Sequence, residues 1–369
     1  MKNIKQLSVK QLAGKTTIVR VDYNVPLKGN KIVETFRIEQ SWPTINFLLK
    51  RDAKILLISH LGDDGERSLK PIAKYLNYHY PTKLAGNFEE ANKLLVKNNL
   101  VLLENLRLWP GEKNNDLFFA KELAKLGDFY INDAFSVCHR THASVVGLSK
   151  YLPSYAGFRL IEEVKNLERV LKPKLPLVVI LGGAKFKTKI PLIKKLTKAK
   201  NIFLGGALAN SFLKAKGFNV GDSIVDSELD YIKPFLKKKN IKLPIDVLVV
   251  NKSGNSMTKK SCEINSREAI FDVGSETIEE IKNAVSKAKT VLWNGPIGWF
   301  EKGYVEGTLE IAKILAEAKA FTIVGGGDTL AAIKKLKLES KFDFVSTGGG
   351  SMLDYVASGG KLPGLKALR

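Results

Sequence analysis

Hydrophobic residues occur along the chain in short continuous runs, and most runs are followed by a stretch in which they recur at helical spacing. In the second half, five runs end in a glycine-rich turn: residues 176–185, 201–210, 291–298, 321–329 and 342–351. A continuous apolar run is typical of a strand buried in a parallel sheet. A helix that begins after such a turn presents unpaired N–H groups and a positive dipole end, which favour phosphate. On one sheet, the five turns would lie side by side at the carboxyl edge, so the pattern predicts a polyphosphate site.

The first half repeats this alternation with different strand ends. Apolar runs are found at residues 16–26, 53–62, 99–108 and 128–135, and helical periodicity at residues 36–52, 68–80, 87–98 and 115–127. These runs end in Arg, Asp, Asn or His instead of paired glycines. The pattern therefore predicts an α/β fold with two domains that share an architecture and differ in ligand chemistry.

Between the halves, residues 157–176 carry apolar residues on one helix face: Leu160, Ile161, Val164, Leu167 and Leu171. Pro173 and Pro176 end this helix, because proline lacks the N–H that a helix interior needs. A single helix between two domains predicts a semi-rigid connector that allows hinge bending.

Composition supports a globular chain of two domains. The sequence has 369 residues, of which 44% are hydrophobic and 26% charged. No apolar stretch reaches the roughly 18 to 20 residues of a membrane helix, and the first residues carry no secretory signal. Cys138 and Cys262 lie far apart without a CxxC partner, which argues against a disulfide framework and a zinc site. These features favour a reducing, cytoplasmic compartment.

The formal net charge of +22 leaves three interpretations open. It could indicate a nucleic-acid-binding protein, a lysine-rich solvated surface, or a site for anionic substrates. Most lysines occupy helical stretches, where they fall on the polar face. They are dispersed and not interleaved with aromatic residues, so nucleic-acid binding is disfavoured, and a site for anions fits the glycine turns best.

Two familiar nucleotide-binding motifs are missing. The stretch LAGKTT at residues 12–17 lacks the first glycine of a P-loop, since Val9 stands there, and it precedes a strand instead of following one. None of the five turns contains GxGxxG, which disfavours a dinucleotide dehydrogenase.

Two other segments favour a bound polyphosphate. Lys185 and Lys189 share a face at the start of a helix, where lysine is unfavourable unless an anion binds there. Asp328, in GGGDT, can cap a helix or bind Mg²⁺ together with phosphate oxygens.

Cationic residues gather at the strand ends of the first half. Arg20, Asp22 and Asn24 alternate along a strand, so we expect all three on one side. Further candidates are Arg37, His60, Arg107, His139 and Arg140. Any one of these residues is more often structural than functional. Together they predict a pocket for a small polyanion, since guanidinium groups bind carboxylate and phosphate with paired hydrogen bonds.

The motifs resemble those of phosphoglycerate kinases over essentially the whole chain. The matching stretches are RVDYNVP, SHLG, LLENLR, NDAFSVCHRTHAS, LGGAKFKTK, FDVGSETI, LWNGPIGWFE, GGGDT and STGGGSMLDYVASGGKLPG. The resemblance implies two doubly wound, Rossmann-like parallel-sheet domains separated by a cleft. It implies an acid-binding domain at residues 1–156, an interdomain helix at 157–172 and a nucleotide-binding domain at 173–352. The C-terminal segment, from about residue 353 to 369, would pack back on the first domain.

The resemblance also implies the site residues. The triose-acid site would comprise Asp22, Asn24, Arg37, His60, Arg107, His139 and Arg140. The nucleotide site would comprise Gly182, Gly183, Lys185, Lys189, Gly205, Gly206, Asn294, Pro296, Glu301, Gly325, Gly326, Gly327, Asp328 and Thr329. Asp328 would hold Mg²⁺ with the nucleotide phosphates, and Arg37 and Lys185 would stabilise the transferred phosphoryl group.

The activity implied is that of a phosphotransferase with a carboxyl acceptor. It moves the acyl phosphate of 1,3-bisphosphoglycerate to MgADP, reversibly, giving ATP and 3-phosphoglycerate, a step of glycolysis and gluconeogenesis. We expect direct in-line transfer with hinge closure, Mg²⁺ and ATP or ADP as ligands, no nucleic-acid or membrane partner, and a monomer. The alternative is another two-domain nucleotide-dependent kinase or ligase that acts on a small carboxylate.

One departure from the family pattern concerns the loop after His60. The family usually reads SHLGRP, with an arginine that contacts the triose acid, whereas this chain reads SHLGDDGER. Asp63 therefore replaces a cation with an anion. Arg67 can substitute if the loop folds back.

Overall fold

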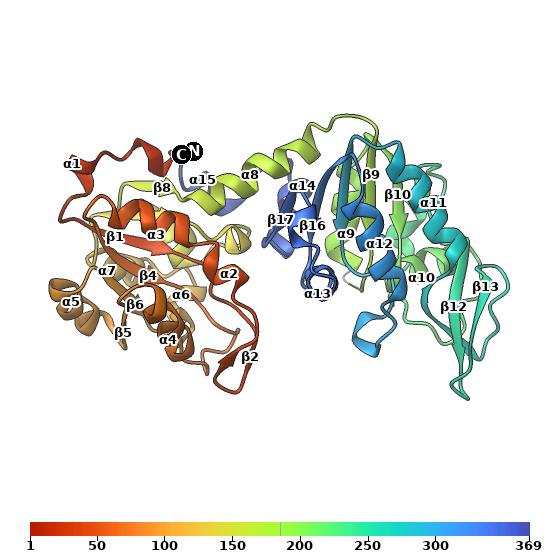
Figure 1. Ribbon diagram of the computed structural model, residues 1–369, viewed down its shortest axis with the longest axis horizontal. Helices are drawn as coiled ribbons and strands as arrows, with labels where there is room; N and C mark the ends of the chain where they lie inside the picture. The colour runs from red at the N-terminus through yellow and green to blue at the C-terminus, as the bar shows by residue number, and fades with distance from the viewer. Residues whose placement is uncertain (185) are drawn as a thin grey trace. The chain divides into compact units, whose positions relative to one another are not determined.

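The computed structural model describes residues 1–184 and 186–369. These residues form two compact units, Met1–Lys165 with Lys361–Arg369, and Asn166–Gly360 (Figure 1). Among the described residues, no helix is both long and apolar enough to cross a membrane.

The first unit is built on a parallel sheet of six described strands in the order β5-β6-β4-β1-β7-β8. Their bounds are β1 Thr16–Arg20, β4 Lys54–Ile58, β5 Lys83–Ala85, β6 Leu100–Leu103, β7 Phe129–Asn132 and β8 Ser154–Ala156. The four predicted strands are confirmed, while the short edge strands β5 and β8 were not predicted from the sequence. Three-residue strands are too short to show a recognisable apolar run.

Helices α4 Lys70–His79, α5 Phe88–Lys97 and α7 Leu117–Ala124 confirm three predicted helical stretches. Asn87 and Asp116 begin α5 and α7, because their side chains accept hydrogen bonds from backbone N–H groups of the first turn. The fourth stretch is divided into α2 Phe36–Glu39 and α3 Trp42–Leu49. The division precedes Pro43, which has no N–H to continue a helix from the preceding turn.

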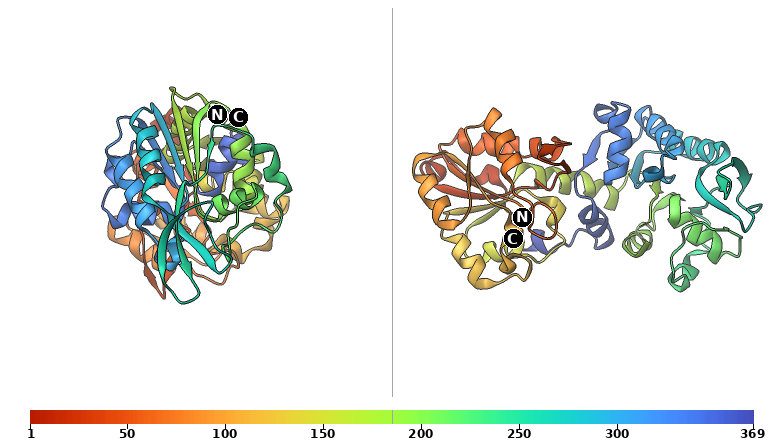
Figure 2. Two further views of the ribbon diagram at one scale, coloured as in Figure 1. Left: turned by 90° about the vertical axis from the view of Figure 1, so that its right-hand side faces the viewer. Right: turned by 90° about the horizontal axis from the view of Figure 1, so that it is seen from below.

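Short elements complete this unit. They are η1 Ile4–Gln6, α1 Val9–Leu12, the hairpin β2 Leu27–Lys28 with β3 Lys31–Ile32, η2 Leu106–Leu108, α6 Pro110–Lys113, η3 Phe135–Val137, η4 Ala143–Gly147, η5 Leu148–Lys150 and α15 Pro363–Lys366. The two chain ends lie side by side, and Lys2 N donates to Leu368 O at 3.1 Å (Figures 1 and 2). Residues Lys361–Arg369 therefore complete the first unit.

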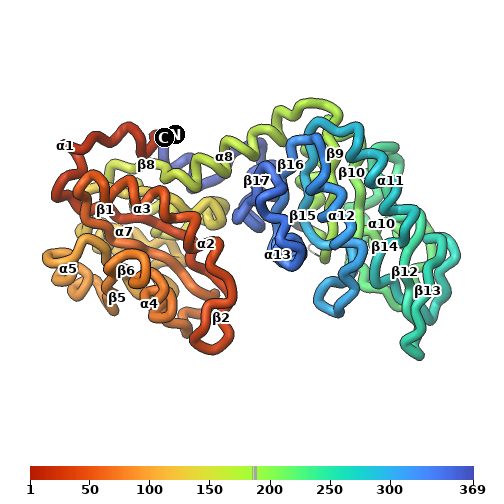
Figure 3. Tube along the Cα trace, in the orientation of Figure 1, coloured from red at the N-terminus to blue at the C-terminus, as the bar shows by residue number. Residues whose placement is uncertain are grey.

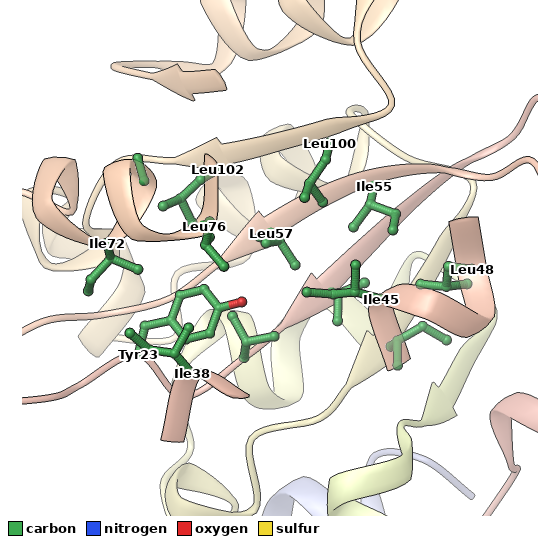
Figure 4. Packing of buried hydrophobic residues seen from close by; sticks show 14 of the residues in the cluster. Tyr23, Ile38, Ile45, Leu48, Ile55, Leu57, Ile72, Leu76, Leu100 and Leu102 are labelled. Atoms are coloured by element: carbon green, nitrogen blue, oxygen red, sulfur yellow. The ribbon is translucent and has the colours of Figure 1, made fainter. Parts of the chain in front are cut away.

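One face of the first sheet carries a continuous hydrophobic core. Ile55 and Leu57 of β4 belong to one buried cluster with residues of α3 and α4, among them Ile45, Leu48 and Leu76, and all five side chains are fully buried (Figure 4). Because the core is packed by residues from several elements, it holds the strand ends, and hence the site residues beyond them, in place.

The second unit contains a parallel sheet in the order β11-β10-β9-β15-β16-β17 among the described strands (Figure 3). Their bounds are β9 Leu177–Leu181, β10 Ala199–Leu204, β11 Ile241–Lys242, β15 Thr290–Asn294, β16 Phe321–Gly325 and β17 Phe344–Ser346. The five glycine-ended runs correspond to neighbouring strands, β10, β9, β15, β16 and β17. The prediction that their turns lie side by side on one sheet is confirmed.

The helices of this unit are α9 Phe186–Lys195, α10 Gly206–Ala215, α11 Ser275–Ser286, α12 Glu306–Ala316, α13 Gly327–Lys335 and α14 Gly350–Ala357, with η6 Asp230–Phe235, η7 Phe300–Lys302 and η8 Glu339–Lys341. Strands β10 and β11 are added to the sheet on one side of β9, and strands β16 and β17 are added on the opposite side, beyond β15. Right-handed crossovers then place the two sets of helices on opposite faces, so the unit is doubly wound.

An antiparallel sheet was not predicted from the sequence. It joins β12 Asp246–Asn251 to β13 Ser256–Lys260 and β14 Glu268–Val273, in the order β13-β12-β14. It packs its own small core, with Val247, Val249 and Ile270 buried.

Helix α8, Phe158–Leu171, is the predicted connecting helix, and it ends before Pro173 as expected. The division between the units falls within it, after Lys165. Helix α14 packs against α9 of the second unit, so the C-terminal residues assigned to the first unit begin at Lys361 and not near residue 353. The assignment of the units to separate ligands stays a prediction.

Candidate active site

Four neighbouring strands of the first unit bring charged side chains to one edge of their sheet. Arg20 ends β1, His60 follows β4, Arg107 lies in η2 after β6, and Arg140 follows η3 after β7. Because β6, β4, β1 and β7 are adjacent and parallel, these residues share the carboxyl edge. This is the edge at which open α/β sheets bind ligands.

Asp22, Asn24 and Arg37 form one contact group at this edge. Arg37 Nη1 lies 3.0 Å from Asp22 Oδ2 and donates to Asn24 O at 3.3 Å. Asn24 Oδ1 accepts a hydrogen bond from Gly62 N at 2.9 Å. The group therefore joins the segment after β1 to α2 and to the loop after β4.

The strand expected to carry Arg20, Asp22 and Asn24 is shorter than predicted. Strand β1 ends at Arg20, and the chain leaves the sheet after Val21, whose N–H still donates to Ile58 O at 3.1 Å. Tyr23 N donates to the Ser59 hydroxyl at 2.9 Å instead of to a neighbouring strand's carbonyl. Arg20 itself is fully buried, so it belongs to the interior of the site.

Arg20 and His60 form a buried pair. Arg20 Nη2 lies 3.0 Å from His60 Nδ1, and Arg20 Nε donates to Ser144 Oγ at 3.0 Å. Burial, and then the charges of Arg20, Arg107 and Arg140, holds the pKa of His60 well below its usual value. The imidazole is therefore neutral at physiological pH. Since Arg20 can only donate, His60 Nδ1 accepts, and the ring proton lies on Nε2.

Arg107 lies in the interior beside a carboxylate. Its side chain and that of Glu112 are both fully buried, with Arg107 Nη1 3.7 Å from Glu112 Oε1. Glu112 also accepts hydrogen bonds from Ser144 N at 2.8 Å and Ser144 Oγ at 2.6 Å. Arg107 Nη1 lies 3.4 Å from His142 Nδ1, and Arg107 Nε and Nη2 are buried without a hydrogen-bond partner. Burial and the neighbouring arginines lower the pKa of His142 to about 3, so this imidazole is neutral too.

The charges in this interior do not balance. Arg20 and Arg107 are buried cations, and among the described residues Glu112 is the buried carboxylate that faces them. Partly exposed Arg140 lies close enough to lower the pKa of His60. An electropositive edge of this kind attracts a small polyanion.

Arg140 and His139 are adjacent in sequence and in space, with Arg140 Nε 3.4 Å from His139 Nε2. Arg140 Nη1 also lies 3.9 Å from Asp63 Oδ1. Asp63 therefore stands beside a cation that was predicted to bind the acid.

The loop that carries Arg67 is held by contacts with Asn105 and Gly62, and the role of Arg67 as a substitute cation stays a prediction. Asn105 Nδ2 donates to Arg67 O at 2.8 Å, and Arg67 Cδ lies 3.7 Å from the position of a Cβ added at Gly62. Arg67 is exposed, so its guanidinium can reach solvent or a ligand.

In the second unit, the glycine turns of adjacent strands touch through their backbones. A Cβ added at Gly182 would lie 1.9 Å from Pro296 O, and one at Gly295 would lie 2.4 Å from Gly182 O. One at Gly206, whose φ is +58°, would lie 2.8 Å from Gly183 N. Side chains are excluded from these turns, so backbone amides form the surface at the strand ends.

Lys189 lies in the first turn of α9, among these turns. It is 3% exposed, and its ammonium donates to Gly182 O. That Lys189 faces bound phosphate stays a prediction. Lys185 lies outside the described residues.

Asn294, at the end of β15, and Thr329, in α13, face the same turns. Thr329 Oγ1 accepts from Gly295 N at 2.9 Å, and both side chains are buried. The Cβ position of Gly326 is 3.4 Å from Thr329 Oγ1 and 3.5 Å from Asn294 Nδ2. The turns after β9, β15 and β16 thus form one surface.

Asp328 and Glu301 are the acidic residues predicted here. Asp328 is exposed in the first turn of α13, beside Gly326 and Gly327, and Glu301 is exposed in η7. Within the described residues there is no group of three His, Cys, Asp or Glu side chains that could hold a metal. One exposed carboxylate beside a phosphate-binding turn suits Mg²⁺ that arrives with a nucleotide, because Mg²⁺ commonly binds one or two carboxylates plus phosphate oxygens.

Three interior residues of the first site were missed by sequence reasoning: Glu112, His142 and Ser144. Glu112 lies in α6 and the other two lie near η4, and these elements meet only in the folded chain. The one sequence signal for Glu112 was the excess of arginine in the first half, because a buried arginine needs a carboxylate partner.

A cavity of about 350 Å³ in the second unit lies elsewhere. It is lined by Val170, Leu171, Pro173, Leu177 and residues 194–198. Leu177 begins β9 whereas the glycine turns follow the strand ends, so this cavity lies at the opposite edge of the sheet.

Comparison with known proteins agrees with this geometry. The family model described as phosphoglycerate kinase matches residues 4–359. The chain belongs to the phosphoglycerate kinase family. It is 40% identical to the phosphoglycerate kinase of Pseudothermotoga lettingae over 99% of both chains. It is 41% identical to that of Wolbachia sp. subsp. Drosophila simulans (strain wRi) over 100% of this chain and 99% of the relative.

Solved structures of family members have the same fold. Phosphoglycerate kinase from Coxiella burnetii matches with a TM-score of 0.85 and 36% identity, covering 99% of this chain and 98% of that one. The enzyme from Pyrococcus horikoshii matches with a TM-score of 0.86 and 28% identity, covering 100% and 98%. Both units of this chain therefore have the Rossmann-like α/β fold of the family.

Proposed function

We propose that this chain catalyses the reversible transfer of the acyl phosphate of 1,3-bisphosphoglycerate to MgADP, giving ATP and 3-phosphoglycerate. The observation that carries the proposal is the excess of buried positive charge at the carboxyl edge of the first sheet. Arg107 has two buried nitrogens without a partner, beside the buried carboxylate of Glu112. Such an interior is stabilised by an anion with several oxygens, as the phosphate and carboxylate of the triose acid provide.

The acid would bind through Asp22, Asn24, Arg37, His60, Arg107, His139 and Arg140. The contact between Arg37 and Asp22 holds the guanidinium toward this edge. Because His60 is neutral with its proton on Nε2, it can donate a hydrogen bond without adding charge. The nucleotide phosphates would bind at the glycine turns, Lys185, Lys189 and Thr329, with Asn294, Pro296 and Glu301 toward the nucleoside.

The chemistry requires no general base. In the direction that consumes ATP, the attacking group is a carboxylate, which is already ionised at neutral pH. Neutral His60, which is buried, and His142, which is partly buried, agree with this, because neither is poised to titrate near pH 7. Catalysis then depends on aligning donor and acceptor and on stabilising the charge of the migrating phosphoryl group, the role we assign to Arg37 and Lys185. Mg²⁺ held by Asp328 would neutralise nucleotide phosphate charge.

Direct transfer also requires the bound acid and nucleotide to meet while water is excluded. We include in the proposal a hinge motion at α8, the helix in which the two units divide. We further propose that the chain acts as a cytoplasmic monomer on small molecules, which sedimentation of the purified protein in the presence of both substrates would test.

A coupled assay with 3-phosphoglycerate and MgATP tests the activity. We expect turnover that saturates in both substrates and reverses with 1,3-bisphosphoglycerate and MgADP. Phosphorylation of another small carboxylate, with none of 3-phosphoglycerate, would favour a different two-domain kinase or ligase.

Arg67 has a test of its own, because it would replace the cation that Asp63 removes. Arg67→Ala should raise KM for 3-phosphoglycerate and leave KM for MgATP unchanged, since the loop belongs to the first unit. Lys70→Ala is the matched control, as it removes another exposed cation from the same segment. An unaltered KM for 3-phosphoglycerate in Arg67→Ala would reject this role.

A further inference from the structure

The loop Leu61–Arg67 carries an acidic side chain to the edge of the anion site. Asp63 Oδ1 lies 3.9 Å from Arg140 Nη1, and the two side chains are 85% and 34% exposed. Arg140 belongs to the residues that we assign to the acid substrate. Asp63 therefore occupies space in which a substrate anion would also be attracted.

Several contacts hold the loop in this position. Lys113 Nζ donates to Asp63 O, and Asn105 Nδ2 donates to Leu61 O at 2.7 Å. A Cβ added at Gly65, whose φ is +88°, would lie 2.6 Å from Arg107 O, so the loop backbone packs directly on η2. The approach of Asp63 to Arg140 is thus fixed by the backbone of the loop.

Asp63 differs from the other carboxylates of the site. Glu112 is buried and accepts hydrogen bonds from Ser144, and Asp22 lies within hydrogen-bond distance of Arg37. At 3.9 Å, the contact of Asp63 with Arg140 is an ion pair without a hydrogen bond. An exposed pair of this kind contributes little to stability, so its carboxylate can move aside at small cost.

We propose that Asp63 is an intramolecular competitor of the acid substrate: its carboxylate partly neutralises Arg140 in the ligand-free enzyme and yields when the substrate anion binds. The inference rests on the proposed function of this site. A competing anion lowers the apparent affinity for 3-phosphoglycerate, because part of the binding energy is used to displace it. Asp63 thereby favours release of the acid and raises its KM.

The test is Asp63→Asn, which removes the charge and keeps the size and the backbone contact to Lys113. We expect KM for 3-phosphoglycerate to fall about two- to fivefold, the range typical of exposed ion pairs. KM for MgATP should not change. Asp64→Asn is the matched control, because it removes the same charge one residue away, and its oxygen can still accept from Glu66 N. We expect its KM values to equal those of the wild type.

A double-mutant cycle shows whether the effect passes through Arg140. In an Arg140→Gln background, Asp63→Asn should leave the affinity for 3-phosphoglycerate, measured by calorimetry, unchanged. An equal fall of KM in Asp63→Asn and Asp64→Asn would show a diffuse charge effect and overturn the inference. An unchanged KM in Asp63→Asn would overturn it too. The proposed function would still stand in that case, provided that the wild-type enzyme turns over 3-phosphoglycerate.

Discussion

At the scale of single residues, the first site is defined by a charge imbalance. Arg20 and Arg107 are buried near the buried carboxylate of Glu112, and the adjacent imidazoles are neutral. An anion that binds at such a site compensates the positive charge. This is favourable because charges in a low-dielectric interior interact strongly. Under the proposed function, a bound substrate anion would complete the charge balance that the polypeptide leaves open.

Arg37 is the residue whose loss should affect turnover most. It is 26% exposed and paired to Asp22, so it can leave that pair for a ligand without unfolding the core. Arg37→Ala should fold normally and reduce kcat on the order of 10³-fold or more, since arginines that stabilise transferred phosphoryl groups contribute effects of this size. Steady-state kinetics with both substrates measures it, and unchanged thermal unfolding is the control. A variant that keeps more than about half of the turnover would refute the role of Arg37.

At the scale of elements, the glycine turns lie next to one another because their strands are neighbours in the sheet. The turns of β9, β10 and β15 approach each other so closely that side chains cannot be inserted. Phosphate binding at a helix N-terminus needs this close approach of bare backbone amides.

Gly182→Ala should disrupt this surface. The added Cβ would lie 1.9 Å from Pro296 O, and a backbone atom cannot move aside as a flexible side chain can. We expect MgATP affinity to fall and the free energy of unfolding to drop by about 1–3 kcal/mol, the usual cost of overpacking. Gly350→Ala is the control, because no atom lies within 4 Å of its added Cβ. Calorimetry and urea denaturation would measure both effects, and equal behaviour of the two variants would contradict the argument.

Asp133 joins β7 to α8, and its titration should be visible in stability. Its Oδ1 accepts from Arg159 N at 2.8 Å and Leu160 N at 3.3 Å, and burial raises its pKa to about 6. Because the folded pKa exceeds the unfolded value, this contribution to stability is fully present below about pH 4 and is lost as the pH rises through about 6.

Asp133→Asn removes this titration. The stability of the wild type relative to the variant should therefore fall between pH 4.5 and pH 7, by up to about 2 kcal/mol in free energy of unfolding. Denaturant unfolding at the two pH values measures it. A difference that does not depend on pH would mean that Asp133 is not the titrating group.

At the scale of the whole molecule, the two ligands are assigned to units that fold around separate cores. Asp328→Ala should therefore weaken binding of the Mg-nucleotide and preserve binding of 3-phosphoglycerate, because Asp328 is exposed and belongs to the second unit. Calorimetry with each ligand alone tests this. Equal loss of both ligands would indicate a folding defect instead.

The sequence by itself determined the architecture of both units and the chemistry of their strand ends. Buried parallel strands require continuous apolar runs, and phosphate-binding turns require glycine, so both features are visible without coordinates. The five glycine-ended runs, the connecting helix and the cationic residues from Arg37 to Arg140 were predicted on that basis. The short strands β5, β8 and β11 and the antiparallel sheet around β12 were not, because they lack a long apolar run.

Only the tertiary structure decided which side chains meet. The contact of Glu112 with Arg107 and Ser144, the end of β1 at Arg20, and the approach of Asp63 to Arg140 follow from packing between elements that are distant in the chain. Local sequence sets the conformation and burial of each element, but it carries no signal for partners that the fold brings together. The balance of charge at the site is therefore a property of the folded molecule.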